Sequence, residues 1–123
     1  MKSSETGWRH LVHSTRYSFK GLKAAFLHEA AFRQELVVCL LLLPFAWWVG
    51  ETSVEWALLI GSCFLVLIVE LLNSAVETAI DRIGPEHHVL SGRAKDIGSA
   101  AVMLSLIMAG TIWGLLLWQK LAA

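Results

Sequence analysis

Three apolar segments without charged side chains alternate with short polar connections along this chain. They cover Leu36 to Gly50, Trp56 to Val69 and Ile97 to Gln119, and they are 15, 14 and 23 residues long. A helix needs about 20 residues to cross a hydrocarbon core of about 30 Å. The third segment is long enough by itself, whereas the first two need residues from their flanks. The pattern predicts an all-α integral membrane protein with three transmembrane helices.

The polar connections set the expected bounds of these helices. We predict them over residues 34–50, 54–83 and 97–119. Gly84-Pro85 is a strong stop for the second helix, because glycine suits the helix cap and proline cannot continue the helix. The second helix therefore extends beyond its uncharged part and carries acidic side chains into the membrane or to its edge.

Residues 8–33 have an amphipathic pattern. Apolar side chains recur at helical spacing and basic side chains occupy another side of the same helix. The apolar set is Trp8, Leu11, Val12, Phe19, Leu22 and Phe26, and the basic set is Arg16, Lys20 and Lys23. This composition suits the headgroup zone of the cytoplasmic leaflet, so we predict an N-terminal surface helix over 8–33. A bundle helix packed on its neighbours is the alternative.

Composition limits the class of protein. The chain has 123 residues and is 56% hydrophobic and 16% charged, which is too apolar for an ordinary soluble domain. We therefore expect a single membrane domain over 1–123. The net charge is zero, so nothing in the overall charge favours a nucleic-acid partner. Cys39 and Cys63 both lie in apolar runs, which indicates buried core residues rather than a disulfide or a metal site.

Charged residues in the connections predict the orientation. Six basic residues precede the first span, Glu51 and Glu55 occupy the first connection, and three basic residues lie in the second connection. Basic residues concentrate in cytoplasmic loops. We therefore expect a cytoplasmic N-terminus and a C-terminus on the outside. Five tryptophans suit an aromatic belt at the outer interface, namely Trp47, Trp48, Trp56, Trp113 and Trp118.

Four polar side chains share one face of the second predicted helix. Glu70, Asn73, Glu77 and Asp81 fall within roughly 80° of arc at about 100° per residue. Glu70 lies about 24 Å along this helix from its outer end, and Glu77 about 10 Å further. The first carboxylate is thus expected near the inner edge of the hydrocarbon and the second at headgroup depth. Carboxylates are costly in a membrane, so this face is a functional-site hypothesis.

The acids and bases at the inner face permit phosphoryl transfer. Carboxylate oxygens bind Mg²⁺ together with substrate phosphates, and a lysine pairs with phosphate charge. A carboxylate near hydrocarbon is suited to take a proton from a lipid hydroxyl. The sequence has no Gly-x-x-x-x-Gly-Lys-[Ser/Thr] nucleotide loop. On these residues alone, a proton or ion path and a small structural membrane subunit remain open.

Three segments in combination resemble the prokaryotic diacylglycerol kinase family. They are Glu29-Ala-Ala-Phe-Arg-Gln-Glu35, then Val69-Glu-Leu-Leu-Asn-Ser-Ala-Val-Glu77, then Ser91-Gly-Arg-Ala-Lys-Asp-Ile-Gly-Ser-Ala-Ala101. The resemblance runs from about Gly7 to Trp118. It implies a homotrimer in the bacterial inner membrane that transfers the γ-phosphate of MgATP to diacylglycerol, with sites shared between neighbouring protomers and a periplasmic C-terminus.

The resemblance also implies roles for single residues. Glu70 would be the general base, supported by Asn73, and Glu29 and Glu77 would hold Mg²⁺. The residues expected to contact ATP are His10, Tyr17, Glu29, Glu77, Glu86, His88, Lys95 and Asp96. Those expected along the lipid substrate are Arg33, Gln34, Glu35, Glu70 and Ser99. The chain departs from the family at His10, where the resemblance implies an arginine. Undecaprenol, another lipid alcohol, is the alternative substrate, and a non-enzymatic scaffold is the alternative of another class.

Overall fold

The computed structural model describes residues 7–84 and 88–123 and folds them into four helices. These are α1 (Trp8–His28), α2 (Ala30–Val49), α3 (Ser53–Ile83) and α4 (Val89–Ala122). No strand occurs in these two described stretches. The last three helices are each long and apolar enough to cross a membrane. The all-α fold with three candidate spans is therefore confirmed.

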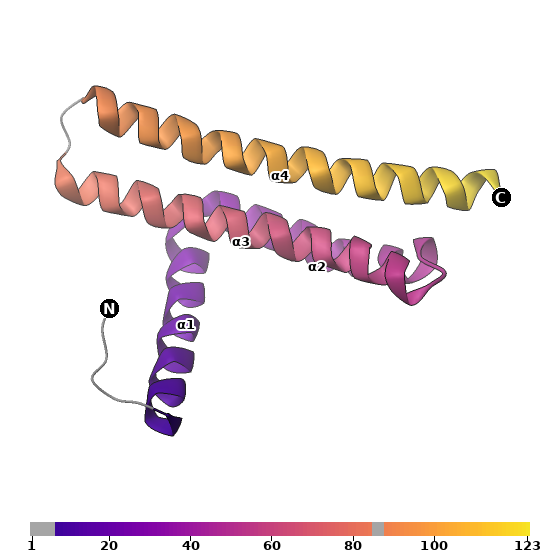
Figure 1. The fold of residues 1–123 in the computed structure, drawn as a ribbon, viewed down its shortest axis with the longest axis horizontal. Helices are drawn as coiled ribbons and strands as arrows, with labels where there is room; N and C mark the ends of the chain where they lie inside the picture. The colour runs from indigo at the N-terminus through magenta and orange to yellow at the C-terminus, as the bar shows by residue number, and fades with distance from the viewer. Residues whose placement is uncertain (1–6, 85–87) are drawn as a thin grey trace.

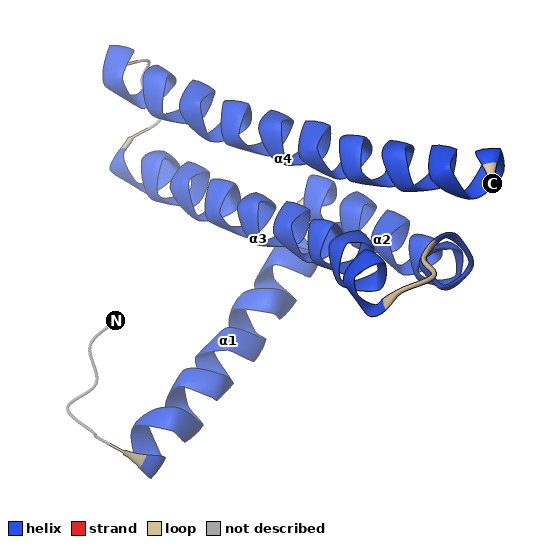
Figure 2. Cartoon of the chain, turned by 45° about the vertical axis from the view of Figure 1, so that its right-hand side comes forward, coloured by secondary structure: helices blue, strands red, loops and turns tan. Residues whose placement is uncertain are grey.

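The three long helices lie side by side, and α1 projects away from them at a steep angle (Figures 1 and 2). The only buried residue of α1 is Ala25, so the amphipathic helix is not absorbed into the bundle of its own chain. The described chain therefore does not pack α1 into its own bundle, and the position of α1 on a membrane surface stays a prediction.

The predicted bounds of the first helix were wrong at its C-terminal end. The surface helix ends at His28 rather than residue 33, and Glu29 has an extended backbone with φ −115° and ψ 104°. Arg33, in the first turn of the next helix, donates through Nη1 to the carbonyls of Phe26 at 2.7 Å and Leu27 at 3.2 Å. This side chain satisfies carbonyls that the end of α1 leaves open, so no glycine or proline is needed at the break.

The turn between α2 and α3 is fixed by capping and by aromatic packing. Thr52 Oγ1 accepts from the Glu55 amide at 3.2 Å, and Glu55 Oε1 accepts from the Glu51 amide at 3.2 Å. These bonds satisfy free amides at the start of α3. Trp47 and Trp56 stack with ring centroids 5.2 Å apart, which joins the two helices at this end. The helix starts at Ser53, one residue before the predicted bound.

A small core holds the outer half of the bundle together. Ala46, Val49 and Leu59 are buried, and side chains of α3 and α4 pack around them, including Ile60, Ile112, Trp113 and Leu116. Within this half, Trp113 Nε1 donates to Ser62 Oγ at 3.1 Å, and Ser62 Oγ donates to the Leu59 carbonyl at 2.8 Å. Cys39 and Cys63 are buried and free, as predicted.

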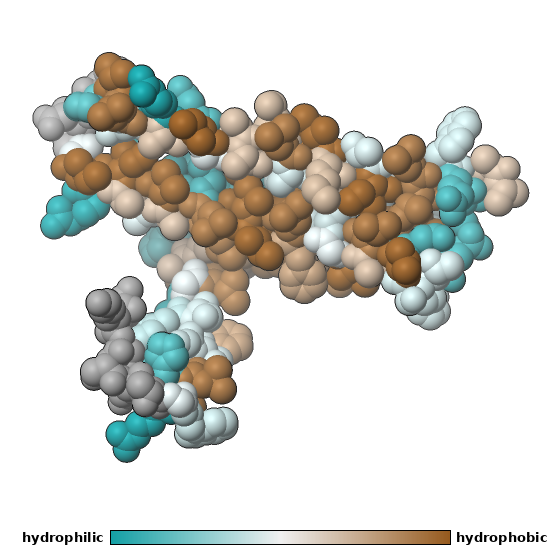
Figure 3. All heavy atoms as spheres, viewed as in Figure 1, coloured by the Kyte–Doolittle hydropathy of each residue, from teal (hydrophilic) through white to brown (hydrophobic). Residues whose placement is uncertain are grey.

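Apolar side chains still cover most of the outside of the bundle. In Figure 3, hydrophobic atoms spread along the middle of the bundle and hydrophilic atoms gather toward its ends. Ser105 is the one buried residue of α4. An apolar surface of this extent is not tolerated in water and needs lipid or other protein chains to cover it.

The fourth helix is longer than its predicted span of 97–119. It begins at Val89, and His88 caps it by accepting the Leu90 amide on Nδ1 at 3.0 Å. Two polar turns therefore precede the apolar part and stack next to the inner end of α3. Hydropathy predicted only the apolar part of this helix. Its start was missed because histidine is not among the residues that commonly cap helices. Pro85, Glu86 and His87 lie outside the described residues.

Candidate active site

The acidic face of α3 runs from the buried middle of the bundle to the polar C-terminal end of this helix. Glu70 is buried, with 5% of its surface exposed, and Asn73 and Glu77 are half-buried. The Asp81 side chain is 68% exposed. Helical spacing brings all four residues to one side of α3, as predicted. Their exposure therefore increases along α3 toward its C-terminal end.

Asn73 is joined to the second carboxylate of this face. Its Nδ2 donates to Glu77 Oε1 at 2.9 Å, one turn further along the helix. A bond to a carboxylate is stronger than one between neutral groups and fixes the orientation of both side chains. This hydrogen bond orients Glu77, the candidate cation ligand. From the sequence, Asn73 was expected to orient Glu70 instead.

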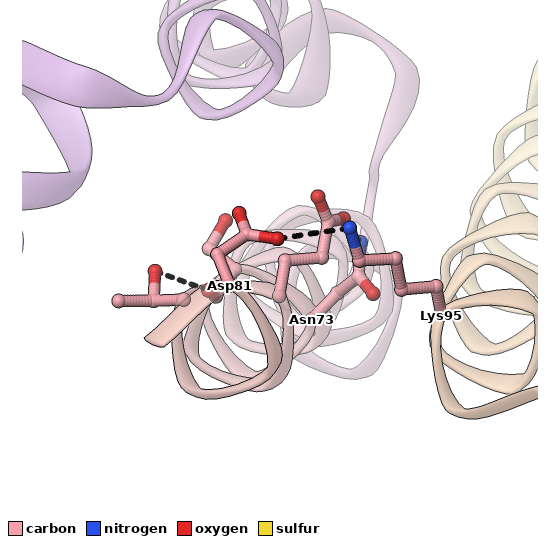
Figure 4. A network of polar contacts seen from close by, with 6 residues as sticks. Asn73, Asp81 and Lys95 are labelled. Carbon is pink, nitrogen blue, oxygen red and sulfur yellow. Dashed lines mark hydrogen bonds and ion pairs between the residues drawn. The ribbon is translucent and has the colours of Figure 1, made fainter. Parts of the chain in front are cut away.

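The inner end of α4 brings a lysine to the same face. Lys95 Nζ lies 2.9 Å from Asp81 Oδ1, and Figure 4 shows Lys95 extending from α4 toward Asp81 and Asn73. Both side chains are largely exposed, so the pair contributes little to stability. Its effect is to place a cation beside the acidic face, where an anionic phosphate would need it. Asp96 and Ser99 are exposed on the same part of α4.

The structure adds a partner for Glu70 that the sequence did not indicate. The carboxyl group of Glu35, on α2, is close enough to the Glu70 carboxyl for the two groups to interact electrostatically. Glu35 Oε2 is buried and has no hydrogen-bond partner among the described residues. A residue predicted along the lipid and the predicted base are therefore neighbours. No pattern along the chain reports this contact, because it joins two helices.

An apolar cavity opens beside this carboxyl pair. It has a volume of about 390 Å³ and lies between α2, α3 and α4. Gln34 and Glu35 line its polar end, and Val38, Leu42, Val66 and Leu106 line its length. A long apolar space with polar groups at one end has the shape and chemistry of a site for an amphiphile. Of the residues predicted along the lipid, Arg33 instead bonds the end of α1.

Glu29 lies apart from this cluster, at the break between α1 and α2. It lines a second cavity of about 950 Å³ between α1 and α3, together with Ser18, His28, Thr78 and Arg82. In the described part of the chain, no three acidic, histidine or cysteine side chains converge in a metal-binding cluster. Carboxylates such as Glu29 and Glu77 suit Mg²⁺, which is commonly held by one or two of them together with waters and substrate phosphates.

The residues predicted to contact ATP fall into two groups within one chain. His10 and Tyr17 are exposed on α1, where Lys20 Nζ lies 5.8 Å from the centre of the Tyr17 ring. Glu77, His88, Lys95 and Asp96 lie at the joined ends of α3 and α4, away from the free end of α1 (Figure 1). His88 uses Nδ1 to cap α4. Glu86 lies outside the described residues.

Comparison with known proteins identifies close relatives. The family model described as prokaryotic diacylglycerol kinase matches residues 16–117. A diacylglycerol kinase of Haemophilus influenzae is 54% identical over 109 residues, which cover 89% of this chain and 92% of that protein. A diacylglycerol kinase of Escherichia coli K12 is 51% identical over 119 residues, or 97% of this chain and 98% of that protein. A diacylglycerol kinase of Pseudomonas aeruginosa is 44% identical over 113 residues, which cover 92% of each chain.

Proposed function

Because the chain belongs to the prokaryotic diacylglycerol kinase family, we propose that it transfers the γ-phosphate of ATP to the free hydroxyl of diacylglycerol. The products are phosphatidic acid and ADP. One observation carries the assignment of the site. A buried carboxylate, Glu70, stands on the same helix face as the bonded pair Asn73 and Glu77, and exposure increases along this face toward the C-terminal end of α3.

We propose Glu70 as the general base. It accepts the proton of the lipid hydroxyl as the hydroxyl oxygen attacks the γ-phosphorus. The new oxygen–phosphorus bond forms while the bond from the γ-phosphorus to the β,γ-bridging oxygen breaks, and ADP leaves. Burial excludes water from this carboxylate and so favours attack by the lipid over hydrolysis. The cavity that ends at Gln34 and Glu35 would hold the acyl chains.

We propose Glu77 and Glu29 as the residues that hold Mg²⁺, with Asn73 fixing the Glu77 carboxylate. The donor set fits the ion, because Mg²⁺ prefers carboxylate oxygens and retains ligands from substrate phosphates. When bound, the ion neutralises phosphate charge that develops during transfer. The bond from Asn73 to Glu77 keeps one carboxylate oxygen in place before the nucleotide arrives.

Lys95 is proposed to bind the phosphates of ATP. Its ion pair with Asp81 holds the ammonium group beside the acidic face, and an exposed pair is easily exchanged for a phosphate partner. We propose that the nucleotide site is completed by Tyr17, Glu86, His88, Asp96 and His10, which stands where the resemblance implies an arginine.

We propose a homotrimer in the inner membrane, with a cytoplasmic N-terminus and a periplasmic C-terminus. The exposed apolar faces of α2 and α4 support contacts with other protomers. Helix α1, which carries His10 and Tyr17, projects away from the joined ends of α3 and α4 (Figure 1), and this supports sites completed by a neighbouring chain. Basic residues on the side of α1 support that side as the cytoplasmic one.

Phosphorylation of lipid in mixed micelles tests this proposal. Purified protein receives labelled ATP and either diacylglycerol or undecaprenol, and the lipid products are separated. We expect labelled phosphatidic acid and little labelled undecaprenyl phosphate. If undecaprenol alone is labelled, the proposed substrate is wrong and the proposed kinase activity stands. No labelled lipid from either substrate would favour a scaffold.

A further inference from the structure

The fourth helix passes the acidic face of α3 at a glycine. A Cβ atom built on Gly98 would overlap Asn73 Oδ1 and lie 3.3 Å from Asn73 Cγ. The other glycines of α4 differ, because a Cβ on Gly92, Gly110 or Gly114 would meet no described atom within 4 Å. Among the glycines of α4, Gly98 is thus the one at which a side chain would collide with a neighbouring helix.

The side-chain amide of Asn73, which Gly98 faces, is held in one orientation by its hydrogen bond to Glu77. Asn73 donates from Nδ2 to Glu77 Oε1 at 2.9 Å, and its Oδ1 is buried against α4 with no hydrogen-bond partner among the described residues. Turning the amide by 180° would place Oδ1 against the Glu77 carboxylate, where two acceptors face each other. The amide therefore has one favourable orientation, and Gly98 leaves the space that this orientation occupies.

We propose that Gly98 is a positioning residue for phosphoryl transfer, acting through Asn73 on Glu77. The inference rests on the proposed function, in which Glu77 holds Mg²⁺. A methyl group at position 98 displaces the end of a flexible side chain rather than backbone, so the helices keep their packing. Asn73 turns away, its bond to Glu77 is lost, and the carboxylate is free to leave the orientation that suits the cation.

The variant Gly98→Ala and the matched control Gly114→Ala test this role. Both make the same change in α4, and alanine is favoured over glycine in a helix interior, so neither should weaken the helix. We expect Gly98→Ala to raise the Mg²⁺ concentration for half-maximal activity about tenfold, as for loss of one bond to a charged group. The KM for diacylglycerol should change less than twofold. Gly114→Ala should match the wild type in both values, and equal behaviour of the two variants would overturn the proposal.

A double substitution shows whether the effect runs through Asn73. Alanine at position 73 has no amide to displace, so Gly98→Ala should add nothing in the Asn73→Ala background. Equal losses from Gly98→Ala in both backgrounds would overturn the proposal. If Gly98→Ala alone does not assemble, the double variant decides the matter. Restored assembly supports the overlap with Asn73, and failure to restore it rejects that overlap.

A spectroscopic readout separates this inference from the proposed function. The side-chain amide of Asn73 gives a pair of ¹⁵N-correlated NMR signals in micelles, identified by their absence from Asn73→Ala. Gly98→Ala should shift both signals and Gly114→Ala should leave them in place. Unshifted signals in Gly98→Ala would reject the contact even if the enzyme is active. A wild-type protein that phosphorylates no lipid would reject the function while the signals still report the contact.

Discussion

Replacement of Glu70 by glutamine tests the proposed base. Glutamine keeps the shape of the side chain and removes its ability to accept a proton. General base catalysis contributes about 10²-fold to 10⁴-fold, which corresponds to about 3 to 5 kcal/mol in the activation free energy. Only 5% of the Glu70 surface is exposed, so water cannot easily replace the carboxylate. We therefore expect kcat to fall by about 10³-fold or more.

The same substitution should leave the protein folded and able to bind nucleotide. Glu70 is close to the carboxyl group of Glu35, and two neighbouring carboxyl groups cannot both be charged without cost, so a neutral amide at position 70 removes that cost. The midpoint of thermal unfolding should be equal to or above that of the wild type. Turnover is measured in mixed micelles with labelled ATP, and the Kd of MgATP should change less than about threefold, or about 0.6 kcal/mol. Near-normal turnover at saturating lipid would refute Glu70 as the base.

Three further substitutions address the cation site, the outer core and the break between helices. Glu77→Gln should raise the Mg²⁺ requirement for activity at least tenfold because a candidate ligand is lost; an unchanged Mg²⁺ titration would count against a metal role. Ser62→Ala should lower the free energy of unfolding by about 1 to 3 kcal/mol, since Trp113 Nε1 loses its acceptor. The control is Ser105→Ala, which removes only a bond within α4 and should cost less in the same denaturant titration. Arg33→Ala should speed hydrogen exchange of amides near Glu29, because two carbonyls of α1 lose their donor. Exchange at the wild-type rate there would show that the break does not depend on Arg33.

The sequence predicted the features that depend on local composition. The three spans, the amphipathic first helix and the common face of Glu70 and Glu77 all follow from hydropathy and helical periodicity, and the structure has them. The resemblance to a family supplied the reaction, and the comparisons agree with it. Roles of single residues stay predictions, because they require nucleotide, lipid or a second protomer.

The features missed by the sequence are contacts between helices. The break after His28 has no glycine or proline, and it depends on a side chain five residues later in the next helix. The proximity of Glu35 and Glu70 and the overlap at Gly98 depend on the rotation of one helix against another. A periodic pattern shows which side of a helix is apolar, but it does not give the neighbour that this side meets.

The join between α1 and α2 consists of a single residue, Glu29. Each residue added to a helix turns the next part of the chain by about 100° and advances it by about 1.5 Å. Inserting or deleting one residue here would either rotate Glu35 away from α3 or turn α1 to a different direction around the bundle. The length of this one-residue connection therefore sets the rotation of the amphipathic helix relative to the three candidate spans.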